Sequence, residues 1–289
     1  MSGRPARVVD AHVHLWDPGH TEWYPYLARV PEGGPGDASR MYRRFDVPTY
    51  RSETAGWNVE KFVNVAAATG PHSVDETLEL DRTAPEAGGP DAIVGGLPPT
   101  ETVAEAVALL DRQLAAARFR GVRPMGLHGG PVPQPEVLRA LRDRGLLFEL
   151  MAHPDQLREA AEQLAAVDDL VVVVEHTGWP RSSGDEERAL WRDGLAALAD
   201  LGDRVSCKLS GLAMPLGSVR AADLRPWLER AIEHFGPDRC CFASNFPVDA
   251  MHGTFDEPFD TFDAVTTRLD PGAREQLFAG TAERLYRLS

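Results

Sequence analysis

Short apolar runs rich in β-branched residues recur along the chain, and stretches with helical periodicity separate them. A run of this kind is typical of a strand that is buried on both faces. We expect eight strands, at 8–14, 62–67, 92–97, 121–123, 146–153, 170–176, 204–209 and 239–244. Apolar and charged stripes between them predict helices at 102–118, 135–144, 154–167, 186–201, 223–235 and 271–288.

The regular alternation of strands and helices predicts the fold class. Eight β-then-α units without internal repeats favour a closed parallel barrel, the (β/α)8 TIM barrel, over an open doubly wound sheet. The open sheet is the structural alternative, but no Gly-rich phosphate-binding motif follows the first predicted strand. The 289 residues suit one such barrel, which needs about 250. We therefore expect a single domain over residues 1–289.

The segment 16–57 interrupts this rhythm with aromatic side chains among many Gly and Pro residues. The aromatic residues are Trp16, Trp23, Tyr24, Tyr26, Tyr42, Phe45, Tyr50 and Trp57. A long loop within a compact domain is usually functional or disordered, and this aromatic content argues against disorder. We expect an aromatic-rich loop after strand 1 that lies over the barrel mouth as a lid or a specificity loop.

Charge and composition narrow the set of partners. The chain has 44 acidic and 30 basic residues, a formal charge of −14, which repels nucleic acid and anionic membranes. The first residues lack the apolar core of a leader, and no run approaches the roughly 18 apolar residues of a membrane span. We expect a cytoplasmic protein whose partner is a small-molecule substrate. The oligomeric state stays open, a homo-oligomer included.

The three cysteines, Cys207, Cys240 and Cys241, lie in apolar runs without the spacing of a zinc finger or a disulfide framework. We expect them to be small buried hydrophobic residues.

The strongest chemical signal is Val-Asp-Ala-His-Val-His-Leu-Trp-Asp at positions 9–17. On a strand, alternate residues share a face, so Asp10, His12 and His14 are expected to point the same way. Strand twist can then bring both imidazoles to one metal ion or one substrate oxygen. The alternative is a pair of hydrogen-bonded core histidines.

A second histidine site is predicted at the end of the strand 170–176, which contains four consecutive valines. His176 ends this strand, and Gly178 lets the chain turn. Polar residues at the carboxyl ends of barrel strands are typical of active sites. We predict that His12, His14 and His176 are catalytic residues and the candidate metal ligands; a capping role is the alternative for His176.

The strand 204–209 places Ser206, Lys208 and Ser210 on one face and apolar residues on the other. The apolar face suits the helix layer, so Lys208 is expected to point into the barrel. A buried lysine must be paired or must serve a ligand. Candidate partners are Glu149, Glu175 and a substrate carboxylate.

Other polar residues fall near the predicted mouth. Glu149 and His153 share a face of the strand 146–153, and Arg123, at the end of strand 4, could clamp an anion in bidentate fashion. Structural ion pairs are an equal alternative for these residues. We predict that Arg123, Lys208, Glu149, His153 and Trp179 bind substrate. Asn245 and Asp249 follow strand 8 as further catalytic candidates, and His128 remains a candidate after strand 4.

Together these motifs resemble the amidohydrolase superfamily, in particular the amidohydrolase-related branch that contains 2-pyrone-4,6-dicarboxylate lactonase and L-fuconolactonase. The resemblance covers nearly the whole chain, from Asp10-Ala-His-Val-His onward. It rests on Arg-Gly-Val-Arg at 120–123, Glu-His-Thr-Gly-Trp-Pro at 175–180, Cys-Lys-Leu-Ser-Gly-Leu at 207–212 and Phe-Ala-Ser-Asn-Phe-Pro-Val at 242–248. It implies an α/β barrel that hydrolyses a small lactone or a related carbonyl compound. It further implies that the three histidines polarise a carbonyl or bind a metal, and that Arg123 and Lys208 hold substrate anions.

One position departs from that family pattern. The branch commonly has Ser-Asp-Trp-Pro after strand 8, with the Asp as general base, whereas this chain has Asn245. An amide cannot take up a proton at neutral pH. Asp249 or Glu149 could take it instead, or Asn245 could orient water, or the reaction could differ from hydrolysis.

Because of this departure at Asn245, both a zinc-dependent and a metal-free site stay open. Three neutral histidines can hold Zn²⁺ with a fourth position for water, and such an ion lessens the need for a strong base. Members of the resembled branch also work without metal, so zinc and a metal-free mechanism are both retained.

The leading hypothesis is a hydrolase acting on a small carboxylated or hydroxylated cyclic ester. Two rivals are kept: a metal-dependent decarboxylase or other lyase on the same barrel, and a non-catalytic barrel that binds a metabolite.

Overall fold

The structure is a computed structural model that describes residues 4–31, 36–124 and 132–288. Eight parallel strands pair in chain order, and a parallel bridge from Val13 to Phe246 joins the last strand to the first. The strands are β1 (Val8–Val13), β2 (Val59–Val65), β3 (Ala92–Leu97), β4 (Phe119–Pro124), β5 (Leu147–Leu150), β6 (Val172–Val174), β7 (Val205–Leu209) and β8 (Cys240–Phe242). The predicted α/β barrel is confirmed, and all eight predicted strands are present.

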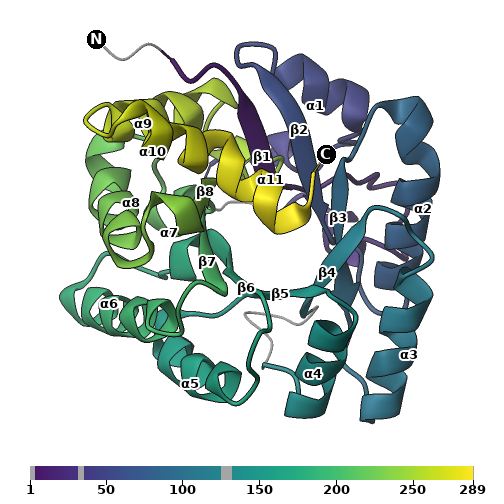
Figure 1. Ribbon diagram of the computed structural model, residues 1–289. Helices are drawn as coiled ribbons and strands as arrows, with labels where there is room; N and C mark the ends of the chain where they lie inside the picture. The colour runs from purple at the N-terminus through teal and green to yellow at the C-terminus, as the bar shows by residue number, and fades with distance from the viewer. Residues whose placement is uncertain (1–3, 32–35, 125–131, 289) are drawn as a thin grey trace.

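Helices surround the ring of strands (Figure 1). They are α1 (Val47–Glu53), α2 (His72–Ala87), α3 (Val103–Gln113), α4 (Pro135–Asp143), α5 (Pro154–Ala165), α6 (Asp185–Ala199), α7 (Ala213–Leu216), α8 (Ala221–Phe235), α9 (Asp256–Thr266), α10 (Pro271–Glu275) and α11 (Thr281–Tyr286). Among these described elements, α1, α2, α7 and α9 are absent from the predicted set. None of the described helices combines the length and the apolar character of a membrane span.

Two of the unpredicted helices, α1 and α2, have a local cause. The side chain of Asp46 accepts a hydrogen bond from the backbone of Thr49 and so caps α1, within the segment that we expected to be a loop. Helix α2 is mostly polar and contains Pro85, which weakens its helical pattern, and it ends at Gly88 with a left-handed backbone (φ 80°).

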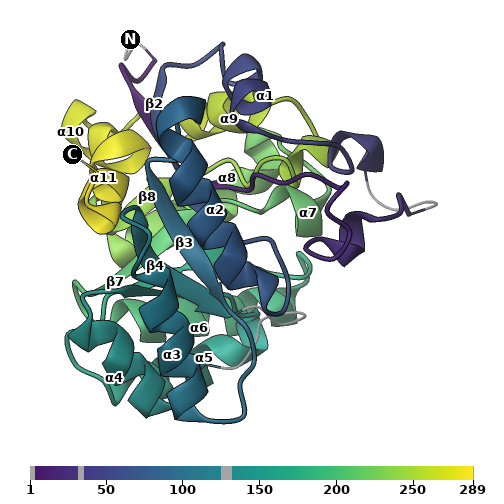
Figure 2. The same ribbon diagram turned by 90° about the vertical axis from the view of Figure 1, so that its right-hand side faces the viewer.

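The barrel interior is filled by small and branched side chains. Inward-facing residues from six strands form one cluster, namely Val9, Ala11, Val63, Val65, Ala92, Val94, Leu147, Val173, Cys241 and Ala243. Residues around α11 join the same cluster, including Leu285 and Tyr286. Helix α11 therefore closes one end of the barrel. Figure 2 shows α10 and α11 at the end opposite the segment that follows β1.

The three cysteines are buried and free, as predicted. On β7, the apolar residues Val205, Cys207 and Leu209 pack in the outer core, and Lys208 lies in the barrel interior, where its ammonium contacts Glu149. The face that we predicted for Lys208 is confirmed.

Candidate active site

Strand β1 contains a bulge that directs two histidines into the barrel. Between β1 and β2 the register changes, so that the step from Asp10 to Val13 is matched by the shorter step from Phe62 to Asn64. A bulge of this kind re-aims the side chains that follow it. Both imidazoles then meet, with His12 Nε2 3.2 Å from His14 Nε2. The predicted convergence of this pair is confirmed.

The expectation that Asp10 shares a face with these histidines is wrong. Its carboxylate accepts a hydrogen bond from the hydroxyl of Tyr50 at 2.9 Å, in the outer layer, and another from the backbone of Ser244 at 2.8 Å. Burial raises the pKa of Asp10, and the hydrogen bonds from Ser244 and Tyr50 oppose that rise. Asp10 therefore ties β1 to the end of β8 from outside the site.

Both histidines of β1 are neutral. Burial, together with the nearby charge of Lys208, lowers the pKa of His12 well below its usual value. Burial and Arg123 lower the pKa of His14 to about 3. The Nδ1 atom of His14 lies 2.7 Å from the carbonyl oxygen of Val65, which can only accept a hydrogen bond. Nδ1 therefore carries the proton, and Nε2 of His14 keeps a free lone pair.

After β6, the backbone turns so that two consecutive side chains enter the site. Glu175 follows the inward alternation of Val173, and the same alternation would send His176 outward. Instead His176 and Thr177 have left-handed backbones, with φ of 51° and 57°. This turn brings His176 beside His12, with 4.6 Å between the ring centroids.

His176 contacts Ser210, the residue that follows β7. Its Nδ1 lies 3.0 Å from the hydroxyl of Ser210. Burial lowers the pKa of His176 to about 4, so this third imidazole is also neutral. The three predicted histidines therefore lie together at the carboxyl ends of β1 and β6.

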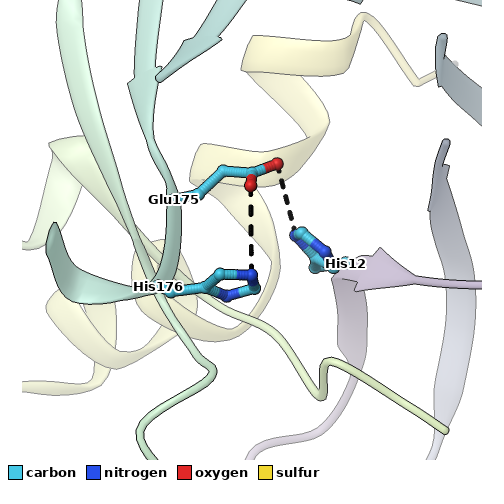
Figure 3. A group of neighbouring side chains, drawn as sticks. All are labelled: His12, Glu175 and His176. Carbon is cyan, nitrogen blue, oxygen red and sulfur yellow. Dashed lines mark ion pairs between the residues drawn. The ribbon is translucent and has the colours of Figure 1, made fainter. Parts of the chain in front are cut away.

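Glu175 faces both His12 and His176 (Figure 3). Its Oε1 is 3.8 Å from His12 Nδ1, and its Oε2 is 3.9 Å from His176 Nε2. Its Oε2 also accepts a hydrogen bond from Arg123 at 3.3 Å. Burial would raise the pKa of Glu175, but the charge of Arg123 and its other neighbours outweighs burial and lowers the pKa to about 2. We did not single out Glu175 as a site residue, although strand alternation from Val173 could have identified it.

Two further charged residues that we predicted to bind substrate are paired with each other. Lys208 donates a hydrogen bond to Glu149 at 2.7 Å, and both side chains are fully buried. This contact selects Glu149 from the three candidate partners. The guanidinium of Arg123 also donates to the carbonyl of Ala66. Contact of these residues with a substrate stays a prediction.

Asn245 and Asp249 form a pair at the end of β8. The backbone of Asn245 donates to the carbonyl of His12 at 2.9 Å, which places Asn245 beside β1. Its side-chain amide donates to Asp249 at 2.9 Å. Burial raises the pKa of Asp249 to about 7. A carboxyl with that pKa can exchange a proton near neutrality, as a general base requires.

His153 and Trp179 lie on the far side of His176. Their rings stack with 4.8 Å between centroids, and His153 Nδ1 lies 3.0 Å from the carbonyl of Trp179. The Trp179 ring is 5.7 Å from that of His176. His128, our other candidate, lies outside the described residues.

Across the site, the segment that follows β1 contacts His14. The ring of Trp16 stacks on that of His14 at 5.7 Å and 7° between planes. Tyr26 packs edge-on against Trp16 and donates its hydroxyl to the carbonyl of Ala67 at 2.9 Å. These two aromatic residues border the site from the side of β1 and β2.

Comparisons with known proteins agree with this geometry. The family model described as Amidohydrolase matches residues 9–288. The chain belongs to the amidohydrolase family. It is 30% identical to protein y4mH of Sinorhizobium fredii over 297 residues, which covers 97% of this chain and 98% of the relative.

Two other amidohydrolase relatives bear on the chemistry. One is L-fucono-1,5-lactonase of Burkholderia ambifaria, 26% identical over 97% of this chain and 95% of the relative. The other is the crystal structure of a Burkholderia multivorans amidohydrolase with bound zinc, at 25% identity and a TM-score of 0.80, covering 98% of this chain and all of that one.

The residues of this amidohydrolase fit a divalent metal ion. His12, Glu175 and His176 each offer a ligand atom, and these atoms lie within 4.8 Å of one another. The 3.2 Å between the Nε2 atoms of His12 and His14 is close to the ligand separation of roughly 3.3 Å around tetrahedral zinc. The Oε1 atom of Glu175 is buried and has no hydrogen-bond partner among the described residues. Imidazole and carboxylate are donors that zinc accepts, so Glu175 joins the three histidines that we predicted as ligands.

A glycine behind His176 offers a test of this packing. A Cβ atom on Gly211 would lie 2.4 Å from His176 Nδ1, whereas one on Gly217 would meet nothing within 4 Å. Both glycines have left-handed backbones, with φ of 65° and 61°. We predict that Gly211→Ala lowers the free energy of unfolding by about 1–3 kcal/mol more than Gly217→Ala, measured by urea unfolding. Equal losses would show that Gly211 makes no room for His176.

Proposed function

We propose that this amidohydrolase hydrolyses a small lactone, a cyclic ester that carries a carboxylate or several hydroxyl groups. The observation that carries the proposal is the cluster of three neutral imidazoles at the carboxyl ends of β1 and β6, with the Asn245–Asp249 pair following β8 beside β1. Two relatives in Burkholderia are named L-fucono-1,5-lactonase, which supports a cyclic ester as substrate.

The first task of the site is to stabilise the oxygen of the ester carbonyl. Water adds to the carbonyl carbon, and negative charge develops on the carbonyl oxygen. A ring N–H of His12 or His176 can donate a hydrogen bond to that oxygen, whereas the lone pair on Nε2 of His14 cannot. A divalent ion held by these histidines and Glu175 would supply Lewis-acid stabilisation of the same oxygen.

The second task is to move protons. We assign the attacking water's proton to Asp249, whose pKa near 7 suits a base at neutral pH. The ring C–O bond then breaks, and the same proton returns to the leaving alkoxide, which gives a hydroxy acid. Asn245 donates to Asp249 and cannot itself take the proton, so it serves to orient that carboxylate.

The third task is recognition. We assign anionic groups of the substrate to Arg123, whose Nε atom is buried without a hydrogen-bond partner among the described residues. Trp179 and His153 on one side, with Trp16 and Tyr26 on the other, would then contact the substrate ring. In this proposal the aromatic residues of the segment after β1 therefore help to select the substrate.

The proposal predicts lactone hydrolysis that depends on Asp249. Purified protein, assayed with and without added Zn²⁺, is expected to open at least one of a panel of sugar-acid and carboxylated lactones. Because Asp249 must be ionised, kcat should fall as pH drops through about 7. Asp249→Asn should lower kcat about 100-fold or more.

Asp91→Asn is the control, because the side chain of Asp91 accepts from the backbone of Phe62 on the neighbouring strand β2, outside the site. It should retain the activity of the unaltered protein. No turnover of any lactone would refute the proposed substrate class. Release of CO₂ from an aromatic acid without incorporation of solvent oxygen would favour a lyase instead.

A second prediction concerns Arg123. Arg123→Lys keeps a positive charge beside Glu175 but loses the planar fork that binds a carboxylate in bidentate fashion. We expect KM for carboxylated lactones to rise about tenfold, in line with a hydrogen bond to a charged group, and KM for uncharged lactones to change little. Equal effects on both substrate classes, measured by steady-state kinetics, would contradict a role in anion recognition. Arg118→Lys, altered at an ion pair with Asp81, is the control.

A further inference from the structure

The C-terminal helix reaches the site through the closed end of the barrel. Tyr286, at the end of α11, is fully buried and packs with the interior residues of the strands. Its hydroxyl donates a hydrogen bond to Glu149 Oε1 at 2.6 Å. Glu149 Oε2 in turn accepts from Lys208 at 2.7 Å. One carboxylate therefore joins α11 to β7.

The chain of contacts continues from Lys208 to His12 and His14. Lys208 Nζ lies 3.4 Å from His12 Nδ1, and His12 Nε2 lies 3.2 Å from His14 Nε2. His14 Nδ1 then contacts the carbonyl of Val65 at 2.7 Å. These contacts run from one end of the barrel to the carboxyl end of β2.

Lys208 and the carbonyl of Val65, on either side of the two histidines, fix the direction of every hydrogen bond between them. An ammonium group has donors and no lone pair, so Lys208 donates and His12 Nδ1 accepts. A carbonyl only accepts, so His14 Nδ1 carries a proton and His14 Nε2 has a lone pair. A neutral imidazole has one N–H, and both constraints place it on Nε2 of His12.

We propose that Tyr286, Glu149 and Lys208 act as positioning residues that hold His12 in the tautomer with its proton on Nε2. The residue in contact with His12 is Lys208. Glu149 holds Lys208 in place, and Tyr286 holds Glu149. A side chain at the closed end of the barrel thereby determines which nitrogen of a site histidine presents a proton.

The tautomer determines what the histidine pair can do. With the proton on Nε2, His12 can donate to an oxygen that arrives between it and His14. To ligate a metal through Nε2, His12 must instead carry its proton on Nδ1. A proton there would face the ammonium of Lys208, which disfavours it, and Glu175 Oε1, which lies 3.8 Å from Nδ1. This consequence for catalysis rests on the proposed function, whereas the tautomer itself does not.

Nitrogen NMR of histidine tests the inference without any substrate. Full-length protein labelled with ¹⁵N in histidine is freed of metal with a chelator, and its imidazole signals are recorded at pH 7.5. A His12→Gln sample identifies the signals of His12. We expect a protonated Nε2 and an unprotonated Nδ1. In Tyr286→Phe, the population of the Nδ1–H tautomer should rise about threefold or more, because Glu149 loses one of the two groups that hold it.

A double variant and a matched control variant complete the test. Glu149→Gln combined with Lys208→Met removes both buried charges together, which avoids leaving either one unpaired, and should shift the His12 tautomer further in the same direction. Tyr24→Phe is the matched control, because it removes a phenol hydroxyl that donates to the buried carboxylate of Glu76 at 2.9 Å, outside the barrel interior. It should leave the His12 signals unchanged.

A proton on Nδ1 of His12 in the unaltered protein would overturn the inference. So would His12 signals that stay the same in Tyr286→Phe and in the double variant. Because no lactone is present, these results stand apart from the proposed function. Failure of every lactone assay would leave the tautomer result intact, and an unexpected tautomer would leave lactone hydrolysis open to its own assay.

Discussion

Two carboxylates, Glu149 and Glu175, and two cations, Lys208 and Arg123, are buried together inside the ring of strands. A single buried charge without a partner would be too costly to keep, so each of these four residues depends on the others. Burial raises the pKa of Glu149 to about 8 against the charge of Lys208, whereas Arg123 and its neighbours outweigh burial at Glu175 and lower its pKa to about 2. Burial also keeps the neighbouring imidazoles neutral. Metal binding requires the lone pair of a neutral imidazole, and a neutral imidazole can also donate its one N–H to a carbonyl oxygen. The proposed chemistry depends on this balance more than on any single residue.

Much of this arrangement could be predicted from the sequence. Apolar runs located all eight strands, because parallel strands buried on both faces leave a strong local signal. The histidines of β1 and β6 were found from their place at strand ends, and strand alternation correctly directed Lys208 inward. Glu149 was among the partners that a buried lysine demanded.

The rest depends on features that strand periodicity does not encode. Alternation with the inward-facing Val9 and Ala11 sends Asp10 outward, and the bulge after Asp10 re-aims His12 and His14 inward. The left-handed backbone at His176 brought that residue into the site directly after Glu175, although strand alternation alone would have sent it outward. Tyr286 lies more than a hundred residues from Glu149, and only the closure of the barrel by α11 brings their side chains together. The helices α1 and α2 carry weak local signals, because one is short and the other is mostly polar.

The most direct test of the central claim is a crystal structure of the protein soaked with Zn²⁺, with anomalous scattering used to locate the ion. We expect an anomalous peak at the carboxyl end of the barrel, within bonding distance of His176 and at least one of His12, His14 and Glu175. A map in which His12 or His176 faces the surrounding helices, or in which zinc binds only elsewhere, would contradict the existence of this site.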